Sequence, residues 1–206
     1  AHAIYKGFSI GQYPRKQFYV YKTGLAYYKY QDYSNAIFYL REALHLKQAS
    51  DIFASIANTV GLAYRNMKVY DSAIYYFQLV HDTSLKRNEQ VWVGIALGNI
   101  GITYFHQKKY SDAEPLLKKD IESSLANSSI RNAINSMIVL AAIYFEQGRH
   151  NEAERLLLSA VYHCHRKSFW SDCELAEQVY ELLYKVYGAK KNYQLSNLYA
   201  DSALMA

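Results

Sequence analysis

The sequence predicts an all-α fold, a solenoid of stacked helical hairpins, and two observations carry this prediction. The first is a phrase that recurs five times: an aromatic anchor, a second aromatic or His six residues later, and a small residue three residues after that. The second is the spacing of the anchors, which stand 37 to 43 residues apart. A fixed period of this length indicates a core built by stacking similar units. The phrases are Tyr27, Tyr33 and Ala36; Tyr64, Tyr70 and Ala73; Tyr104, Tyr110 and Ala113; Tyr144, His150 and Ala153; and, less well kept, Tyr187, Tyr193 and Ser196.

Composition favours one continuous array. With 206 residues, 51% of them hydrophobic and 16% aromatic, the chain can bury a large core. The longest apolar run, residues 137–145, is far shorter than the roughly 18 residues that would suggest a membrane span. We therefore expect a soluble protein without membrane insertion. The sequence starts with Ala and shows no charged-then-apolar leader, so we expect that any signal peptide or preceding domain has been removed or was never included. The compartment stays unknown, with the cytoplasm slightly favoured over the periplasm.

The charge pattern argues against nucleic acid as a partner. The formal net charge is +5, but Lys and Arg are scattered along the chain and occur at most in pairs. A nucleic-acid-binding surface would instead show a basic patch or stripe. We expect no nucleic acid at this segment.

The units are expected at about residues 17–49, 50–87, 88–127, 128–167 and 168–206. Residues 1–16 break the pattern with two Gly and a Pro, and are interpreted as a linker or the remnant of a preceding helix. In the third unit, residues 91–105 form the first helix and 106–109 a polar turn. Apolar residues on two faces of this helix suit packing on both sides.

The second helix of each unit is expected to begin directly after the second aromatic. A capping residue follows that aromatic in four units, and Ser111 with Glu114 has the spacing of a capping box. The small residue of the phrase should then lie where the second helix presses on the first. The predicted caps are Ser34, Asp71, Ser111 and Asn151.

Two stretches resemble a known repeat family. Residues 60–64 read Val-Gly-Leu-Ala-Tyr and precede Ala73 and Phe77, and residues 100–104 read Ile-Gly-Ile-Thr-Tyr and precede Ala113 and Leu117. Both resemble the Leu-Gly-x-x-Tyr…Ala…Phe pattern of tetratricopeptide repeats, and the resemblance covers about residues 17–206. It implies a right-handed α-solenoid with long repeats of about 40 residues, as in bacterial signalling and regulatory proteins. Departures include Asp120, where a small residue is usual.

The resemblance also implies a concave groove lined by the first helix of each hairpin. Three asparagines recur there, and an amide can both donate to and accept from a peptide backbone. The alternative is that these asparagines bond within their own hairpin and that most of the tyrosines belong to the core. The candidate partner-binding residues are Tyr21, Tyr28, Asn58, Arg65, Asn99, Phe105, His106, Asn135 and Phe145.

No motif supports catalysis, a cofactor or a metal. His163, Cys164, His165 and Cys173 lack the spacings of zinc ligands, and no phosphate loop or dinucleotide fingerprint is present. The two cysteines either pair or remain buried thiols, and the sequence leaves both open. We expect neither catalytic residues nor enzymatic activity.

These observations favour a non-enzymatic module that binds a protein or peptide in the groove, as the sensory or regulatory segment of a larger bacterial signalling protein. The chain stops where the fifth hairpin finishes, so we expect a piece of a longer protein or an end covered by another chain. One alternative is a structural module that forms a homodimer. Another is an inhibitor of a response regulator that a signalling peptide releases.

Overall fold

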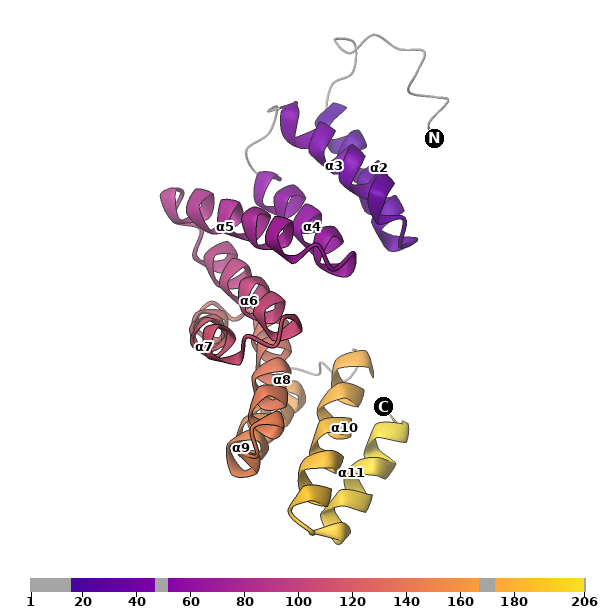
Figure 1. The fold of residues 1–206 in the computed structure, drawn as a ribbon, viewed down its shortest axis with the longest axis vertical. Coiled ribbons are helices and arrows are strands. Elements are labelled where there is room, and N and C mark those ends of the chain that lie inside the picture. The colour runs from indigo at the N-terminus through magenta and orange to yellow at the C-terminus, as the bar shows by residue number, and fades with distance from the viewer. Residues whose placement is uncertain (1–15, 47–51, 167–172, 206) are drawn as a thin grey trace. The chain divides into compact units, whose positions relative to one another are not determined.

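The computed structural model describes residues 16–46, 52–166 and 173–205, and these residues form ten α-helices and no strand. The predicted all-α class is therefore confirmed (Figure 1). The chain divides into two compact units, residues 1–96 and 97–206. Consecutive helices pair as hairpins, and we call the first helix of each hairpin an A helix and the second a B helix.

In the first unit, α2 packs on α3, α3 on α4, and α4 on α5. Their core contains Leu40, Ile56 and Val60, none of which is exposed. The amino-terminal part of α6 adds Ala96 to a neighbouring cluster with Ala57. The helices are α2 (Lys16–Lys29), α3 (Tyr33–His45), α4 (Phe53–Asn66), α5 (Tyr70–Lys86) and α6 (Gln90–His106).

In the second unit, α8 packs between α7 and α9, and α10 packs on α9 and α11. One continuous core cluster runs through these helices and includes Leu117, Leu140 and Leu183. The helices are α7 (Tyr110–Ala126), α8 (Ile130–Glu146), α9 (His150–Arg166), α10 (Cys173–Ala189) and α11 (Tyr193–Met205).

The small residue of the recurring phrase lies where the sequence predicts, inside each hairpin. Ala36, Ala73, Ala113 and Ala153 have no exposed surface. In the third hairpin, a Cβ atom added to Gly101 of α6 would stand 2.9 Å from Cγ of Leu117 on α7. The two helices therefore touch so closely that any side chain at position 101 would collide with Leu117.

The predicted starts of the B helices are wrong by one or two residues. Each B helix begins at the second aromatic or His itself, so Ser34, Asp71, Ser111 and Asn151 lie inside the first turn. The residue before the aromatic supplies the cap where one forms: Asp32 Oδ1 accepts the Asn35 N–H at 3.2 Å.

The shape of the turn explains this shift. Each turn between an A and a B helix holds one residue with a positive φ between 58° and 73°, and a single residue separates it from the next helix. The new helix therefore starts as soon as the chain leaves the left-handed region. These turn residues are Gln31, Lys68, Lys108, Gly148 and Lys191.

Stacked tyrosines fill a second position of the repeat that the sequence pattern did not show. Tyr27 stacks on Tyr39 with ring centroids 5.3 Å apart. The same pairing joins an anchor to a tyrosine twelve residues later in the second hairpin (Tyr64 and Tyr76, 5.7 Å) and the fifth (Tyr187 and Tyr199, 5.5 Å). The third and fourth hairpins carry Leu116 and Leu156 at this position.

An ion cluster joins the third hairpin to the fourth. Glu114 of α7 accepts hydrogen bonds from the Tyr144 hydroxyl at 3.0 Å, from Arg149 Nη1 at 3.0 Å and from Lys118 Nζ at 2.7 Å. Partial burial raises the pKa of Glu114, but these hydrogen bonds outweigh it and lower that pKa to about 2. The glutamate predicted to belong to a capping box therefore serves the junction between repeats instead.

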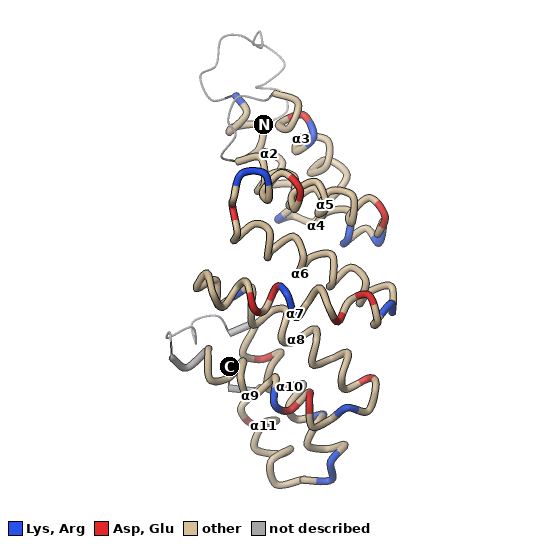
Figure 2. The backbone as a smooth tube through the Cα atoms, turned by 90° about the vertical axis from the view of Figure 1, so that its left-hand side faces the viewer, with Lys and Arg blue, Asp and Glu red and all other residues tan. Residues whose placement is uncertain are grey.

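The same arrangement recurs one repeat later. Glu154 of α9 accepts a hydrogen bond from the Tyr187 hydroxyl at 2.8 Å and pairs with Lys190 in the following turn. In both cases, a glutamate of one hairpin contacts the anchor tyrosine of the next hairpin and a basic residue in the turn of that next hairpin. Figure 2 shows acidic and basic residues interspersed along the helices.

A buried carboxyl group lies at the centre of the contact between α6, α7 and α8. Asp120 is only 2% exposed, and its two oxygens accept hydrogen bonds from Ser124 Oγ at 2.8 Å and Ser136 Oγ at 2.5 Å. A Cβ atom on Gly98 would collide with Asp120 Oδ2, so glycine is required there. Burial raises the pKa of Asp120 to about 6, against the lowering effect of the two serine hydroxyls.

Candidate functional site

In the first unit, the predicted groove residues connect neighbouring A helices. Tyr21 of α2 is buried, and its hydroxyl lies 2.5 Å from Ser55 Oγ of α4. Tyr28 lies seven residues after Tyr21, on the same face of α2. Its hydroxyl accepts a hydrogen bond from Asn66 Nδ2 of α4 at 3.3 Å. Burial is the main cause that raises the pKa of Tyr28. Both tyrosines therefore hold α2 against α4, and Tyr28 remains half-buried.

Arg65 and Asn58 lie seven residues apart on α4, so they share a face of that helix. Both are half-buried. The Arg65 guanidinium carbon lies 5.8 Å from the ring centroid of Phe77, and burial lowers the pKa of this group to about 10. Arg65 is still a cation at neutral pH. Both residues also make contacts within the chain.

In the second unit, α8 carries a strip of polar and apolar residues on the side that points away from α7 and α9, the helices on which it packs. Its members are spaced by three or four residues, which places them on one helix face. Asn135 is exposed on this strip, and Val139 is half-buried beside it. The strip consists of Arg131, Asn135, Val139, Ala142 and Glu146.

The neighbouring A helix, α6, brings Asn99 and His106 to one face, again seven residues apart. Asn99 is half-buried and His106 is exposed. A Cβ atom on Gly98 of α6 would stand 3.1 Å from Ser136 Oγ of α8, so the two helices are in direct contact there. Asn99 is the residue after Gly98, and Asn135 is the residue before Ser136. The structure thus places two of the three candidate asparagines on adjacent turns of adjacent helices.

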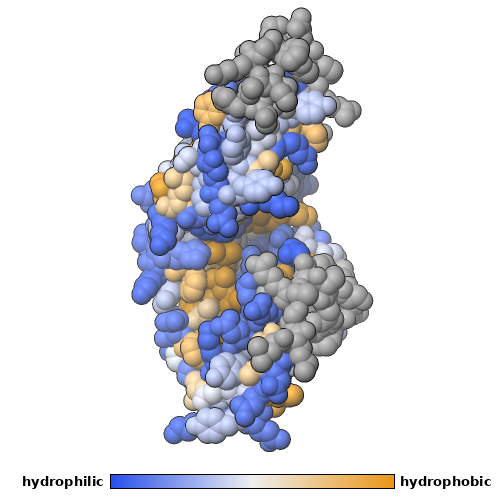
Figure 3. Space-filling view, turned by 90° about the vertical axis from the view of Figure 1, so that its right-hand side faces the viewer, coloured by the Kyte–Doolittle hydropathy of each residue, from blue (hydrophilic) through white to orange (hydrophobic). Residues whose placement is uncertain are grey.

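The two phenylalanines of the candidate set pack beside the B-helix starts. Phe105 stacks on Tyr110 with centroids 5.9 Å apart, and Phe145 contacts the His150 ring at 5.3 Å. Both are half-buried, so each offers part of a ring to a partner. On the single face shown in Figure 3, hydrophobic surface gathers in patches among hydrophilic residues.

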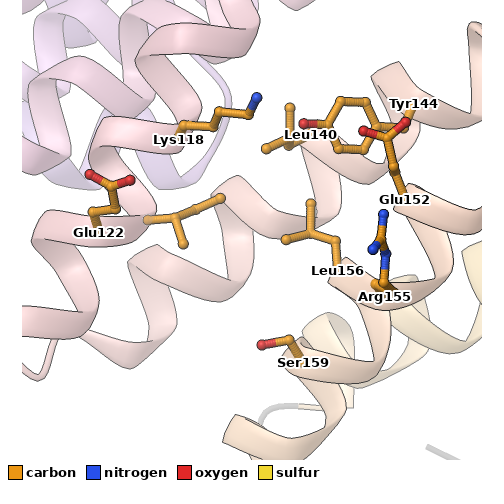
Figure 4. Close-up of a pocket in the computed structure, with 9 residues that line it drawn as sticks. Lys118, Glu122, Leu140, Tyr144, Glu152, Arg155, Leu156 and Ser159 are labelled. Carbon is orange, nitrogen blue, oxygen red and sulfur yellow. The ribbon is translucent and has the colours of Figure 1, made fainter. Parts of the chain in front are cut away.

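The second unit also holds a pocket of about 340 Å³ that the sequence analysis missed. Its apolar floor is formed by Ile121, Leu140, Tyr144 and Leu156, and Figure 4 shows the last three of these side chains. Charged side chains of α7 and α9 line its rim: Lys118, Glu122, Glu152 and Arg155. The available sequence signal was Leu156, which stands where three other hairpins carry tyrosine.

Two further searches of the described residues bear on other functions. No helix among them combines the length and the apolar character needed to cross a membrane. Within the same residues, no three His, Cys, Asp or Glu side chains gather as a possible metal site. The side chains of Cys164 and Cys173, and hence their pairing, lie outside the described residues.

Comparison with known proteins identifies the repeats. A family model described as tetratricopeptide repeat matches residues 94–124 and 134–167, which contain most of α6 to α9. The expected resemblance is thereby confirmed at two repeats. No curated protein sequence matches the chain.

Solved structures share the fold at low sequence identity. BtubC (BKLC) from P. vanneervenii aligns with a TM-score of 0.74 and 18% identity, over 88% of this chain and 76% of that protein. The apo form of RapI aligns with a TM-score of 0.72 and 15% identity, over 99% and 87%. Aspartyl phosphate phosphatase F from Bacillus subtilis aligns with a TM-score of 0.70 and 17% identity, over 92% and 59%.

Proposed function

We propose that this array of tetratricopeptide repeats is a non-enzymatic protein-interaction module, which binds a segment of another protein against the exposed face of its A helices. The observation that carries the proposal is the pair Asn99 and Asn135. They lie beside the contact between α6 and α8, and the strip around Asn135 mixes amide, apolar and charged groups. Such a surface suits a peptide whose backbone needs hydrogen bonds and whose side chains need apolar contact.

The half-buried rings of Phe105 and Phe145 extend this surface toward the ends of α6 and α8. Partly exposed aromatic rings are the residues that most often anchor a protein interface. In the first unit, Arg65 offers a cation and Tyr28 a half-buried ring, so an acidic or aromatic side chain is the expected contact there.

The likeness to RapI and to aspartyl phosphate phosphatase F supports a regulatory role within a larger bacterial signalling protein. It rests on fold alone, since the identities are 15% and 17%. The partner is then a protein segment, with no need for a cofactor at the A-helix face.

Self-association is a second candidate function, and exposed apolar side chains favour it. Leu198 of α11 is 56% exposed and Tyr184 of α10 is 43% exposed. Sedimentation of the chain beside a Leu198→Glu variant tests this candidate, because a homodimer formed through this surface would dissociate on the substitution.

The main proposal can be tested by selecting peptides from a displayed random library against the purified chain. Selected peptides should lose affinity for an Asn99→Ala and Asn135→Ala double variant of unchanged helicity. A matched control is Glu122→Ala, which changes an exposed residue on the pocket side of α7. Peptides that bind the double variant as tightly as the parent chain would refute the assignment of the A-helix face.

A further inference from the structure

The pocket of Figure 4 lies at a position where the repeat pattern changes. In the first, second and fifth hairpins, the tyrosine twelve residues after the anchor stacks on the anchor ring. In the fourth hairpin the anchor is Tyr144 and the residue twelve positions later is Leu156. Both line the pocket. The chain therefore leaves open, beside Tyr144, the space that it fills with a phenol ring in three other hairpins.

The pocket is large enough to hold an aromatic side chain. The volume of about 340 Å³ lies near the lower end of the roughly 300–1,000 Å³ typical of ligand pockets. Leu140 and Tyr144 belong to the packed core of the unit, with 2% and 5% of their surface exposed, so the floor is rigid. Tyr144 is the aromatic residue of the pocket, and the Arg149 guanidinium carbon already lies 3.9 Å from its ring centroid, so an incoming ring is limited to the part of Tyr144 that faces the pocket.

The charges at the rim distinguish between possible occupants. Lys118 is already paired with Glu114 at 2.7 Å, and Glu152 with Arg149 at 2.6 Å. Arg155 on the α9 wall and Glu122 on the α7 wall form no ion pair with any residue that the structure describes. The hydrogen bond from Arg149 lowers the pKa of Glu152, and attraction to Arg155 acts in the same direction. Arg155 therefore remains the cation that an anionic group of an occupant can reach.

We propose that this pocket binds an aromatic side chain carried by an amphipathic helix of a partner protein, with an acidic residue about one turn away that pairs with Arg155. A helix is the expected carrier because the pocket lies between two helices, α7 and α9, and such grooves take helical ligands through spaced anchors. Within the chain itself, the ring that fills the corresponding space also projects from a helix.

This surface is separate from the A-helix face. On α8, Leu140 and Tyr144 follow Asn135 by five and nine residues. At 3.6 residues per turn, these intervals place them about 140° and 180° around the helix axis from Asn135. A partner could thus occupy the pocket while a second segment lies along the exposed strip of α8.

The test uses an alanine-based helical peptide with one Tyr and an Asp four residues later, titrated into the full chain and followed through the methyl NMR signals of Ile121, Leu140 and Leu156. We expect saturable binding with shifts at these methyl groups. Replacing the peptide Tyr by Ala should abolish binding. Arg155→Gln should weaken it by up to about fivefold, the range of an exposed ion pair.

The decisive variant is Leu156→Tyr, which introduces the residue that the first, second and fifth hairpins carry at this position and should fill the pocket. We expect it to fold and to lose peptide binding. Leu116→Tyr makes the same change at the corresponding position of the third hairpin, outside the pocket, and should leave binding unchanged. Binding that survives Leu156→Tyr, or a parent chain that does not bind the peptide, would overturn the proposal. Neither result would affect peptides selected through Asn99 and Asn135.

Discussion

Replacing Asp120 by Asn should stabilise the protein at neutral pH and leave its stability nearly unchanged in acid. The Asp120 carboxyl group has a pKa of about 6 in the folded state, against an ordinary value of 3.8. Because the folded state holds this proton more tightly, the stabilising contribution is fully present below pH 3.8 and is lost as the pH rises through about 6. At 1.36 kcal/mol per pKa unit, ionisation of the buried group costs about 3 kcal/mol of folding free energy.

Asn has the size of Asp and can bond to both Ser124 and Ser136, but it carries no charge. The expected gain is therefore near zero at about pH 4 and grows to about 3 kcal/mol at about pH 7.5. Urea unfolding followed by circular dichroism at a series of pH values measures it. Asp112→Asn on the same helix is the control, because Asp112 is exposed.

The difference between the Asp120→Asn variant and the parent should therefore widen between about pH 4 and about pH 7. The Asp112→Asn variant should stay within about 1 kcal/mol of the parent, because the Asp112 charge acts only on the exposed start of α7. Parallel curves for the Asp120→Asn variant and the parent would refute the reasoning, because they would mean that the Asp120 carboxylate ionises in the folded state without cost.

Two further predictions concern packing and the junction between repeats. Gly101→Ala should destabilise the protein by about 1–3 kcal/mol through overpacking against Leu117. Gly188→Ala, whose Cβ would lie 3.6 Å from Ser196 Oγ, should instead stabilise it by up to about 1 kcal/mol. Chemical unfolding of both variants checks that the two changes in stability have opposite signs. Tyr144→Phe removes the hydroxyl that donates to Glu114 and should cost about 1 kcal/mol at neutral pH. That cost should shrink as the pH falls from 4.5, the ordinary pKa of a glutamate, to about 2, because Glu114 is then protonated. A Tyr144→Phe cost that is the same at neutral pH and at about pH 2 would contradict the described cluster.

The sequence was sufficient to predict the hairpins because their signals are local. Helical periodicity and the spacing from Tyr104 to Tyr110 to Ala113 are contained within a single hairpin, and Ala113 is buried as expected. The predicted cap positions are wrong because residue type alone does not determine where a helix starts. The backbone conformation of the turn, set at Lys108, decides where α7 begins.

The less local features could not be predicted from the pattern. Asp120 stood out as a departure, but its partner Ser136 lies on another helix, and nothing in the spacing joins the two. The pocket lies beside Leu156, where three other hairpins carry a tyrosine that stacks on the anchor ring. That role of the position is known only from the stacked pairs in the structure, such as Tyr187 and Tyr199. The candidate groove residues remain a prediction, since the structure shows where they lie but contains no partner.

The two glutamate clusters have a consequence for how the second unit comes apart. Glu114 joins the third hairpin to the fourth, and Glu154 joins the fourth to the fifth. Each is a coupling between nearest neighbours in a one-dimensional array, so the free energy of the unit is close to a sum of hairpin and junction terms. Loss of the α10 and α11 hairpin would break the Glu154 junction and leave the Glu114 junction intact. The second unit can therefore unfold stepwise from the α11 end, with the α10 and α11 hairpin opening before the α8 and α9 hairpin.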